Sequence, residues 1–310
     1  MHIGQHAPAE HVIAHVSDTH VGAGTTVYGR IRAAEQLRTV MDRIVEIAPD
    51  AIVFTGDVAD AGESAAYETV RSIVEPAADR IGAEVVWVMG NHDARAPFAR
   101  HLMGVEADPD APLDHVTELD GLRIVAIDTT IPGYHDGRLS AAQLDWLRDV
   151  LASPAPHGTV LAMHHPPIPS HMPLMTVIEL ADQHQLAEAV EGTDVRVILA
   201  GHYHYSAHST LGSVPVHVGS STCYVVDTGA DPRGMHAVDA PVAFDLVHVH
   251  ADRVVHSSVP VSPGALVLDY PVESLDHVSA MTAEVRRETF ARASADIDAI
   301  ALVRGDTLGG

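Results

Sequence analysis

The chain has 310 residues, of which 46% are hydrophobic, so it can bury a substantial core as one large α/β domain or as one domain with an appendage. Its 42 Asp and Glu residues outnumber 18 Arg residues, there is no Lys, and the formal net charge is −24. Such a field repels nucleic acids and anionic membranes, which argues against both as partners. An anionic substrate would need local positive charge from a few Arg, from backbone N–H groups, or from metal ions held by some of the 23 His residues.

The single cysteine, Cys223, excludes an internal disulfide and a cysteine-based zinc site, and we expect it to be a small buried residue. Residues 1–11 lack a basic region followed by a long apolar run, so they do not resemble a secretory signal. No segment reaches the roughly 20 apolar residues that a membrane span requires. We therefore expect a cytoplasmic protein.

The first half of the chain alternates predicted strands and helices, and a polar motif follows each strand. Strands are predicted at residues 12–17, 51–55 and 85–89, and helices at 30–48 and 64–81. The motifs are Asp18-Thr19-His20, Gly56-Asp57 and Gly90-Asn91-His92-Asp93. Parallel strands joined in this way present their carboxyl ends at one edge of a sheet, so these side chains should meet there. Asp18 and His20 are two residues apart, so an extended segment would point both to the same side.

The second half begins with a predicted hairpin, in which Asp120-Gly121 separates residues 116–119 from 122–127. Asp128 then reads as a cap or turn residue. A helix at 140–151 with Ser140 as its N-cap precedes a strand at 160–163 and His164-His165. The Pro- and Met-rich segment 166–175 is either a wall that packs against an organic leaving group or a surface loop docked on its own core.

A further helix at 181–191 and a strand at 195–199 lead to the motif Gly201-His202-Tyr203-His204. Strands at 213–219, 242–250 and 254–261 follow, and we expect them to form an antiparallel meander. Residues 1–262 are thus expected to form the catalytic domain, and residues 263–310 a helical C-terminal appendage. Hydrophobic residues of the appendage fall near helical spacing, which favours packing on the domain or dimerisation over disorder: Val278, Met281, Val285, Phe290 and Ile297.

The residue types in the motifs indicate metal binding. His, Asp and Asn offer mixed nitrogen and oxygen ligands, which suit Mn, Fe or Zn better than Ca or Mg. Seven candidate ligands are too many for one tetrahedral site: Asp18, His20, Asp57, Asn91, His164, His202 and His204. Two ions that share one carboxylate would use them all, and two-metal sites bind phosphoryl oxygens and activate water for in-line displacement.

Five motifs in a fixed order, D-x-H, GD, GNHD, H and GHxH, resemble those of the calcineurin-like metallophosphoesterases. Within that superfamily the chain is most similar to the class III cyclic nucleotide phosphodiesterases of bacteria, including mycobacteria, over residues from His11 to about Val261. The resemblance implies an α/β fold, a four-layer αββα sandwich of two mixed β-sheets flanked by helices. It also implies two metal ions, with Fe and Mn favoured and Mn/Mn or Zn left open, and a homodimer such as relatives commonly form.

The resemblance further assigns roles to the matched residues. Asp18, His20 and His204 would hold the first ion, Asn91, His164 and His202 the second, and Asp57 would bridge both. A hydroxide bridging the metals would attack phosphorus, and His92 would be the general acid that assists the leaving oxygen. Asp93 would orient His92 or its loop, and His165 would only neighbour the site. Other His residues are expected to be surface or satisfied positions, such as His101, His115, His217 and His248.

Departures from other relatives narrow the activity to hydrolysis of a small phosphodiester. Residues 56–62 read GDVADAG where Ser/Thr protein phosphatases have GDxxDRG, Asp60 stands where purple acid phosphatases have Tyr, and His92 argues against lipid-precursor pyrophosphatases. A cyclic nucleotide is favoured, 3′,5′- or 2′,3′-cyclic AMP, with the nucleoside monophosphate as product. Glycerophosphodiester hydrolysis and broad-specificity phosphoesterase activity are the nearest alternatives. A catalytically silent scaffold is disfavoured, because the seven candidate ligands and His92 are all present. A nuclease is disfavoured, because the acidic sequence shows no run of basic residues that would bind DNA.

Overall fold

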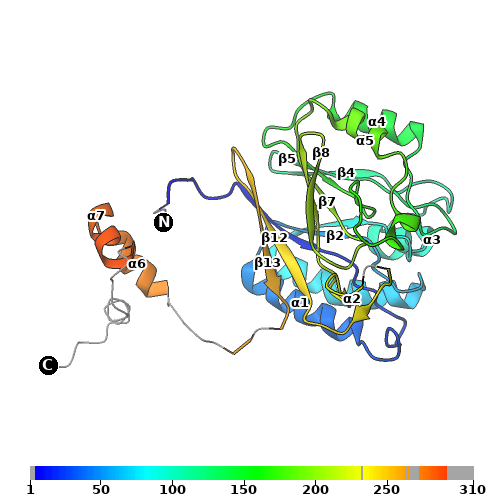
Figure 1. Ribbon diagram of the computed structural model, residues 1–310, viewed down its shortest axis with the longest axis horizontal. Coiled ribbons are helices and arrows are strands. Elements are labelled where there is room, and N and C mark those ends of the chain that lie inside the picture. The colour runs from blue at the N-terminus through cyan, green and yellow to red at the C-terminus, as the bar shows by residue number, and fades with distance from the viewer. Residues whose placement is uncertain (1–3, 232, 263, 266–271, 292–310) are drawn as a thin grey trace. The chain divides into compact units, whose positions relative to one another are not determined.

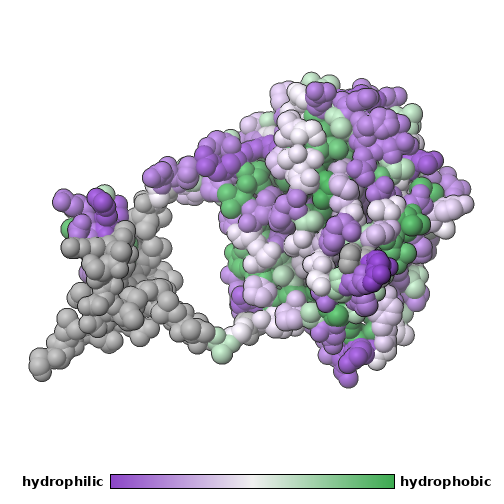
Figure 2. Space-filling model, in the orientation of Figure 1, coloured by the Kyte–Doolittle hydropathy of each residue, from purple (hydrophilic) through white to green (hydrophobic). Residues whose placement is uncertain are grey.

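The computed structural model describes residues 4–231, 233–262, 264–265 and 272–291. The chain divides into two compact units: one is Ala9–Ser262, and the other combines Met1–Pro8 with Pro263–Gly310. Among the described helices, none is both long and apolar enough to cross a bilayer. On the visible face of Ala9–Ser262, hydrophilic residues surround smaller hydrophobic areas, in keeping with the acidic composition (Figure 2).

Two mixed β-sheets form the centre of the unit Ala9–Ser262 (Figure 1). The five-stranded sheet has the order β13-β12-β1-β2-β3, with β1 His11–Val16, β2 Ala51–Thr55, β3 Glu84–Val88, β12 Ala243–Val249 and β13 Val254–Pro260. The six-stranded sheet has the order β4-β5-β6-β7-β9-β8, with β4 His115–Leu119, β5 Leu122–Ala126, β6 Thr159–Ala162, β7 Val195–Ala200, β8 Ala207–Leu211 and β9 Val214–Val218. The strands β1 to β3 are parallel, as are β5, β6, β7 and β9, and antiparallel strands are added at the edges. Two short strands, β10 Val225–Val226 and β11 Ala237–Val238, pair separately.

Helices cover the outer face of each sheet, which completes the predicted four-layer αββα sandwich. The helices α1 Ala33–Ile47 and α2 Ser64–Ile81 pack their apolar faces on the five-stranded sheet, and α4 Ala141–Leu151 and α5 Gln183–Val190 pack on the six-stranded sheet. A third layer of apolar side chains lies between the sheets and includes Ile13, Val53, Ile124 and Val197. Short helical segments connect these parts: α3 Arg95–Phe98, the π-helical turn η1 Ala99–Met103 and the 3-10 turn η2 Met175–Ile178.

Local sequence explains most element boundaries. In α1 the buried residues Leu37, Val40, Met41 and Ile44 recur at helical spacing, and Ala48, in the left-handed conformation, ends the helix before Pro49. This helix begins three residues later than predicted, because Ile31 pairs with Val27 in an isolated bridge. The Asp-Gly hairpin is present, with positive φ at Asp120 and Gly121. Ser140 forms the predicted N-cap of α4 in a capping box with Gln143.

The predicted antiparallel meander is wrong. The strand β9 lies parallel to β7, and β8, which was not predicted, pairs with β9 in the six-stranded sheet. The strand β12 instead joins β1 in the other sheet, and only the β12–β13 hairpin follows the prediction. Strand periodicity gives the burial pattern of a strand but not its partner, and the partner of β12 is far away in the sequence.

The second unit contains α6 Val272–Ala280, α7 Ala283–Arg286 and the π-helical turn η3 Arg287–Ala291. The helical spacing predicted for this appendage is interrupted at Met281 and Thr282, where the Thr282 side chain caps α7 by accepting a hydrogen bond from the backbone N–H of Val285. The side chain of Phe290 and all of Ile297 lie outside what the structure describes.

Candidate metal centre

Each predicted ligand follows the carboxyl end of a parallel strand. The five-stranded sheet supplies Asp18 and His20 after β1, Asp57 after β2 and Asn91 after β3. The six-stranded sheet supplies His164 after β6, and His202 and His204 after β7. The site therefore lies where the two sheets meet at this edge, and the predicted convergence is correct.

The local backbone brings the paired ligands together in a way the sequence did not predict. Asp18 and His20 have φ of 53° and 45°, so the segment is turned by left-handed residues and is not extended. His202 and His204, with φ of 71° and 56°, repeat this geometry. Glycines are required beside them: a Cβ on Gly90 would lie 2.1 Å from the backbone nitrogen of Asp57, and one on Gly201 would lie 1.9 Å from Oγ of Ser17.

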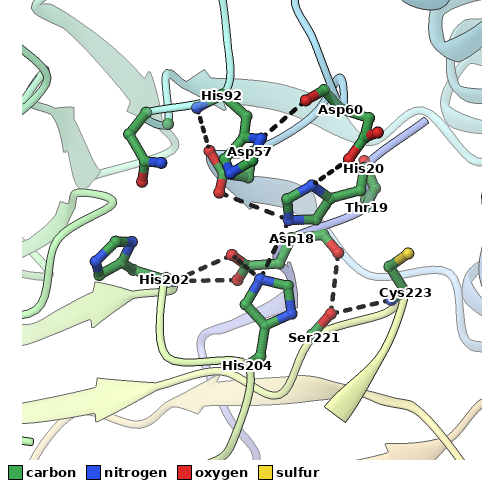
Figure 3. A network of polar contacts seen from close by, with 12 residues as sticks. Asp18, Thr19, His20, Asp57, Asp60, His92, His202, His204, Ser221 and Cys223 are labelled. Carbon is green, nitrogen blue, oxygen red and sulfur yellow. Dashed lines mark hydrogen bonds and ion pairs between the residues drawn. The ribbon is translucent and has the colours of Figure 1, made fainter. Parts of the chain in front are cut away.

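One half of the site is a buried group of Asp18, His20, Asp57 and His204, whose donor atoms lie within 4.8 Å of one another (Figure 3). Nε2 of His20 lies 3.1 Å from Nε2 of His204. Nε2 of His204 lies 3.3 Å from Oδ1 of Asp18. Oδ2 of Asp57 lies 3.6 Å from Nε2 of His20.

The other half is formed by Asn91, His164 and His202. Nε2 of His164 lies 3.0 Å from Oδ1 of Asn91 and 3.2 Å from Nδ1 of His202. It also lies 3.5 Å from Oδ2 of Asp57. The same Asp57 oxygen therefore borders both halves.

The outer hydrogen bonds of the imidazoles define which nitrogen carries the proton. Nδ1 of His164 donates to the carbonyl of Thr55, and Nε2 of His202 donates to that of Ile178. Nδ1 of His204 likewise donates to the carbonyl of Tyr224, and Nδ1 of His20 faces the Asp60 carboxylate. In the neutral rings the inner nitrogens then carry lone pairs. Nε2 of His20 lies 3.1 Å from Nε2 of His204, and Nδ1 of His202 lies 3.2 Å from Nε2 of His164, so these lone pairs face one another. Lone pairs repel at such distances unless a cation lies between them, so these residues fit metal ions.

Further residues hold the ligands in place, and sequence reasoning missed two of them. Oδ1 of Asp60 lies 3.1 Å from Nδ1 of His20, and the Asn91 amide lies 2.9 Å from Nδ1 of His135. Asp60 sits three residues after Asp57, a spacing that could have identified it. His135 belongs to no motif, since it reaches the site from a loop 44 residues beyond Asn91. Asp18 is fixed by the Ser17 hydroxyl, at 2.6 Å, and by the backbone N–H of His202.

His92 lies beside the ligands, as its predicted role requires. Its backbone N–H donates to Oδ1 of Asp57, and its Nδ1 donates to the carbonyl of Asp60, which leaves Nε2 for the pocket that His92 lines. Burial lowers the pKa of His92, but the Asp57 charge and the Asp60 carbonyl outweigh it, so the pKa lies above the ordinary value.

Asp93 contacts the loops around the site. Its carboxylate accepts hydrogen bonds from the backbone N–H groups of Val58, Ala59 and Gly90 and from the Tyr67 hydroxyl. Burial nevertheless raises the pKa of Asp93 to about 6. These contacts fit the part of the prediction in which Asp93 orients the loop.

Charges at the centre favour cations. Burial would raise the pKa of Asp57, but the neighbouring His residues, His164 first, hold it well below the ordinary value. Burial lowers the pKa of His164, whereas Asp57 outweighs this effect and raises that pKa to about 9. Burial and the nearby His164 lower the pKa of His202 to about 3. The carboxylate that attracts a proton to His164 would equally stabilise a metal ion.

A cavity of about 260 Å³ opens beside the two halves of the site. Its polar side is formed by Asp57, Asn91, His92, His135, His202 and His204. Its apolar side is formed by Tyr28, Met175, Ile178, Tyr224, Val226 and Met235. Of the segment 166–175, Ile168, Met172 and Met175 are buried in the core, as the docked-loop alternative predicts, and Met175 also lines the cavity. That this segment packs against an organic leaving group stays a prediction.

The structure also shows where four other residues named in the sequence analysis lie. His165 is buried and its ring packs against His164 and His202, as a neighbour of the site should. Cys223 is buried, as predicted. Asp128 accepts hydrogen bonds from Thr130 as a turn residue and also pairs with Arg95. His217 is not at the surface, because it is buried; its Nδ1 lies 2.9 Å from Nδ1 of His208, and its Nε2 lies 3.1 Å from Oδ2 of Asp245.

The calcineurin-like phosphoesterase family matches residues 11–206, and the chain belongs to this family. A cAMP/cGMP dual specificity phosphodiesterase of Mycobacterium tuberculosis is 48% identical over 266 residues, which are 85% of this chain and 83% of that protein. A probable cyclic nucleotide phosphodiesterase of Rhodococcus erythropolis is 47% identical over 254 residues, 81% of this chain and 84% of that protein. A dimetal phosphatase from Danio rerio has the same fold, with a TM-score of 0.58 at 15% identity over 83% of this chain and 98% of that one. The predicted family and fold are thereby confirmed.

Proposed function

We propose that this protein is a dinuclear-metal phosphodiesterase that hydrolyses a cyclic nucleotide to the nucleoside monophosphate. The observation that carries the proposal is the placement of Asp57 between two groups of inward-facing imidazole nitrogens. The printed activity of the 48% identical relative supports the substrate class.

The residues fit two transition-metal ions. Asp18, His20 and His204 would hold the first ion, Asn91, His164 and His202 the second, and Asp57 would be shared. We propose Fe and Mn, with Mn/Mn or Zn as alternatives, because mixed imidazole and carboxylate ligands suit these metals. When bound, such ions polarise phosphoryl oxygens and lower the pKa of a water nucleophile.

The chain's own side chains supply orientation and a proton. The Asp60 carbonyl holds the His92 ring so that Nε2 faces the cavity, where it can donate a proton to the leaving oxygen. Asp93 acts as a positioning residue, since it anchors the loops that carry Asp57 and Asn91. The apolar side of the cavity would exclude water and contact the organic part of the substrate.

The remaining expectations stay proposals. We propose a cytoplasmic protein that acts on small phosphodiesters and not on nucleic acids, and that forms a homodimer. Residues 1–262 would be the catalytic domain, and residues 263–310 an appendage that packs on it or contributes to the dimer.

The test is hydrolysis by Mn-loaded protein of 3′,5′-cyclic AMP, 2′,3′-cyclic AMP, glycerophosphocholine and an aryl phosphodiester. Asn91→Ala serves as the background control, because it removes a proposed ligand. We expect cyclic-nucleotide turnover that disappears in this variant. Preference for glycerophosphocholine, or turnover of the aryl diester alone, would overturn the substrate class, and inactivity with every metal would favour the silent scaffold.

A further inference from the structure

A second cluster of metal-competent side chains lies between the two sheets, outside the site described above. His15 on β1 and Asp245 on β12 are direct partners in the five-stranded sheet, and His217 on β9 approaches them from the six-stranded sheet. All three are at most 2% exposed. One donor atom from each lies within 4.8 Å of the other two.

Two buried nitrogen atoms at this cluster have no hydrogen-bond partner, Nδ1 of His15 and Nδ1 of the neighbouring His256. Nε2 of His217 and Oδ2 of Asp245 lie 3.1 Å apart as an ion pair. Unpaired buried polar atoms are costly, so two of them beside a buried ion pair indicate a missing shared partner.

The other polar atoms of His15, His217 and Asp245 all have hydrogen-bond partners. Nε2 of His15 lies 2.8 Å from Oγ1 of Thr55, whose hydroxyl proton goes to Ser17. Nε2 of His15 is therefore the donor, and Nδ1 of the neutral ring is a lone pair. Nδ1 of His217 lies 2.9 Å from Nδ1 of His208, and Oδ1 of Asp245 accepts the Ser258 hydroxyl. Nδ1 of His15 and the paired Nε2 of His217 and Oδ2 of Asp245 are therefore the candidate ligand atoms.

We propose that His15, His217 and Asp245 bind one divalent transition-metal ion of the zinc type. Nε2 of His217 lies 3.1 Å from Oδ2 of Asp245, close to the roughly 3.3 Å that separates two ligands about 2.0 Å from a tetrahedral zinc. Two imidazoles and a carboxylate are a usual zinc ligand set. A bare His217–Asp245 ion pair would not provide a partner for His15.

The surroundings supply a fourth ligand and an entry route. The His256 ring stacks on His217 with centroids 4.2 Å apart, and its unpartnered Nδ1 makes it the nearest further nitrogen ligand. His208, in contact with His217, is exposed at the edge of the six-stranded sheet, so the cluster lies one side chain below the surface. An ion here would fasten β1 and β12 to β9 and so join the two sheets.

The ion would also be connected to the dinuclear centre. His15 donates to Thr55, Thr55 donates to Ser17, and Ser17 donates to the proposed ligand Asp18. Each hydroxyl has one proton, so the chain of donors has a fixed direction toward the Asp18 carboxylate.

The test measures zinc per chain by mass spectrometry after Zn²⁺ loading and removal of free metal. We expect His217→Gln and Asp245→Asn each to bind one ion fewer than the wild type. The matched controls are His157→Gln, from a His–His pair elsewhere in the unit, and Asp194→Asn, whose carboxylate has an unpartnered oxygen. Both controls should bind as many ions as the wild type. Equal zinc content in all variants would overturn the proposal.

Zinc-edge anomalous scattering from wild-type crystals keeps the test decisive if the variants do not fold. A peak between His15, His217 and Asp245 is expected, and peaks confined to the dinuclear centre or to His208 would contradict the site. Asn91→Ala separates this proposal from the proposed function, because it should lose an ion at the dinuclear centre and keep the one between the sheets.

Discussion

At the scale of single residues, the unusual backbone conformations are concentrated at the metal centre. Nine described non-glycine residues have positive φ, and five of them are candidate ligands: Asp18, His20, Asp57, His202 and His204. Such conformations are costly and persist where the surrounding structure enforces them. The residues that hold the ligands, Asp60 and His135 among them, should therefore matter for metal affinity.

Replacing Asp60 by Asn should weaken metal binding. The carboxylate that orients His20 and increases its basicity would become a neutral amide, and loss of such outer contacts typically costs about 10- to 100-fold in metal affinity. The measurement is the Mn²⁺ concentration that gives half-maximal turnover. Asp110→Asn, at an exposed residue of another loop, is the control and should behave as the wild type. An unchanged Mn²⁺ requirement in Asp60→Asn would remove Asp60 from the supporting residues.

Asp114 should make the stability depend on pH. Burial raises its pKa from 3.8 to about 6, so the native state holds more protons than the unfolded state between these values. The free energy of unfolding then falls as pH rises from about 4 to 6. Asp114→Asn keeps an oxygen that accepts the hydrogen bonds from the Asp128 backbone N–H and the Gln143 amide. Because the Asn side chain does not ionise, the variant should not lose stability over this pH range. Relative to the wild type, the variant should gain about 1–2 kcal/mol between pH 4.5 and 7.5, measured by urea unfolding; a pH-independent difference would contradict this account.

At the scale of elements, hydrophobic periodicity and turn residues predicted the bounds of helices and strands that depend on residues close in the sequence. The predicted bounds of β2 and α2 agree with the structure, since hydrophobic periodicity and flanking turn residues define them. The pairing of β12 with β1 was missed, because it joins segments about 230 residues apart and no local pattern encodes it. The candidate ligands were identified through strand ends and motif order, and the structure brings them together. His135 and the inter-sheet His217 were not identified, because each acquires its neighbours only through the tertiary fold.

The connections around the site depend on the buried pair of Arg95, at the start of α3, and Asp128, after β5. Their side chains lie 3.0 Å apart and are at most 5% exposed, and Arg95 also donates to carbonyls of Pro109 and Thr130. Arg95→Leu should destabilise the protein by about 3–5 kcal/mol, because it leaves Asp128 buried without its cation.

Urea unfolding of Arg95→Leu, Asp128→Asn and the double variant would measure this coupling. The double variant should lose less than the sum of the single losses, since no uncompensated charge remains. The matched control is Arg71→Leu, because Arg71 and Glu75 form a helical pair in which both side chains are 51% exposed. It should cost no more than about 1 kcal/mol. Strictly additive losses of unfolding free energy in the two single variants would show that the Arg95–Asp128 ion pair does not cause the destabilisation.

At the scale of the whole molecule, the candidate metal centre lies between the two sheets of the unit Ala9–Ser262. Asp18, His20, Asp57 and Asn91 come from the five-stranded sheet, and His164, His202 and His204 come from the six-stranded sheet. With a net charge of −24, the chain also gains from any bound cation. Metal binding should therefore stabilise the whole sandwich and not only the loops that carry the ligands.

Metal removal by a chelator should lower Tm by about 5–10 °C. A ligand present at about 100 times its Kd stabilises the native state by roughly 2.7 kcal/mol, and one kcal/mol shifts Tm by about 2–4 °C in a domain of this size. Calorimetry of Mn-loaded and chelated protein measures the shift, with Asn91→Ala as the control that should show a smaller one. Because the ligands divide between the sheets, both sheets should melt together at the lower temperature. A chelated protein with wild-type Tm, in which metal analysis confirms that the ions have gone, would mean that the sheets hold together by apolar packing alone.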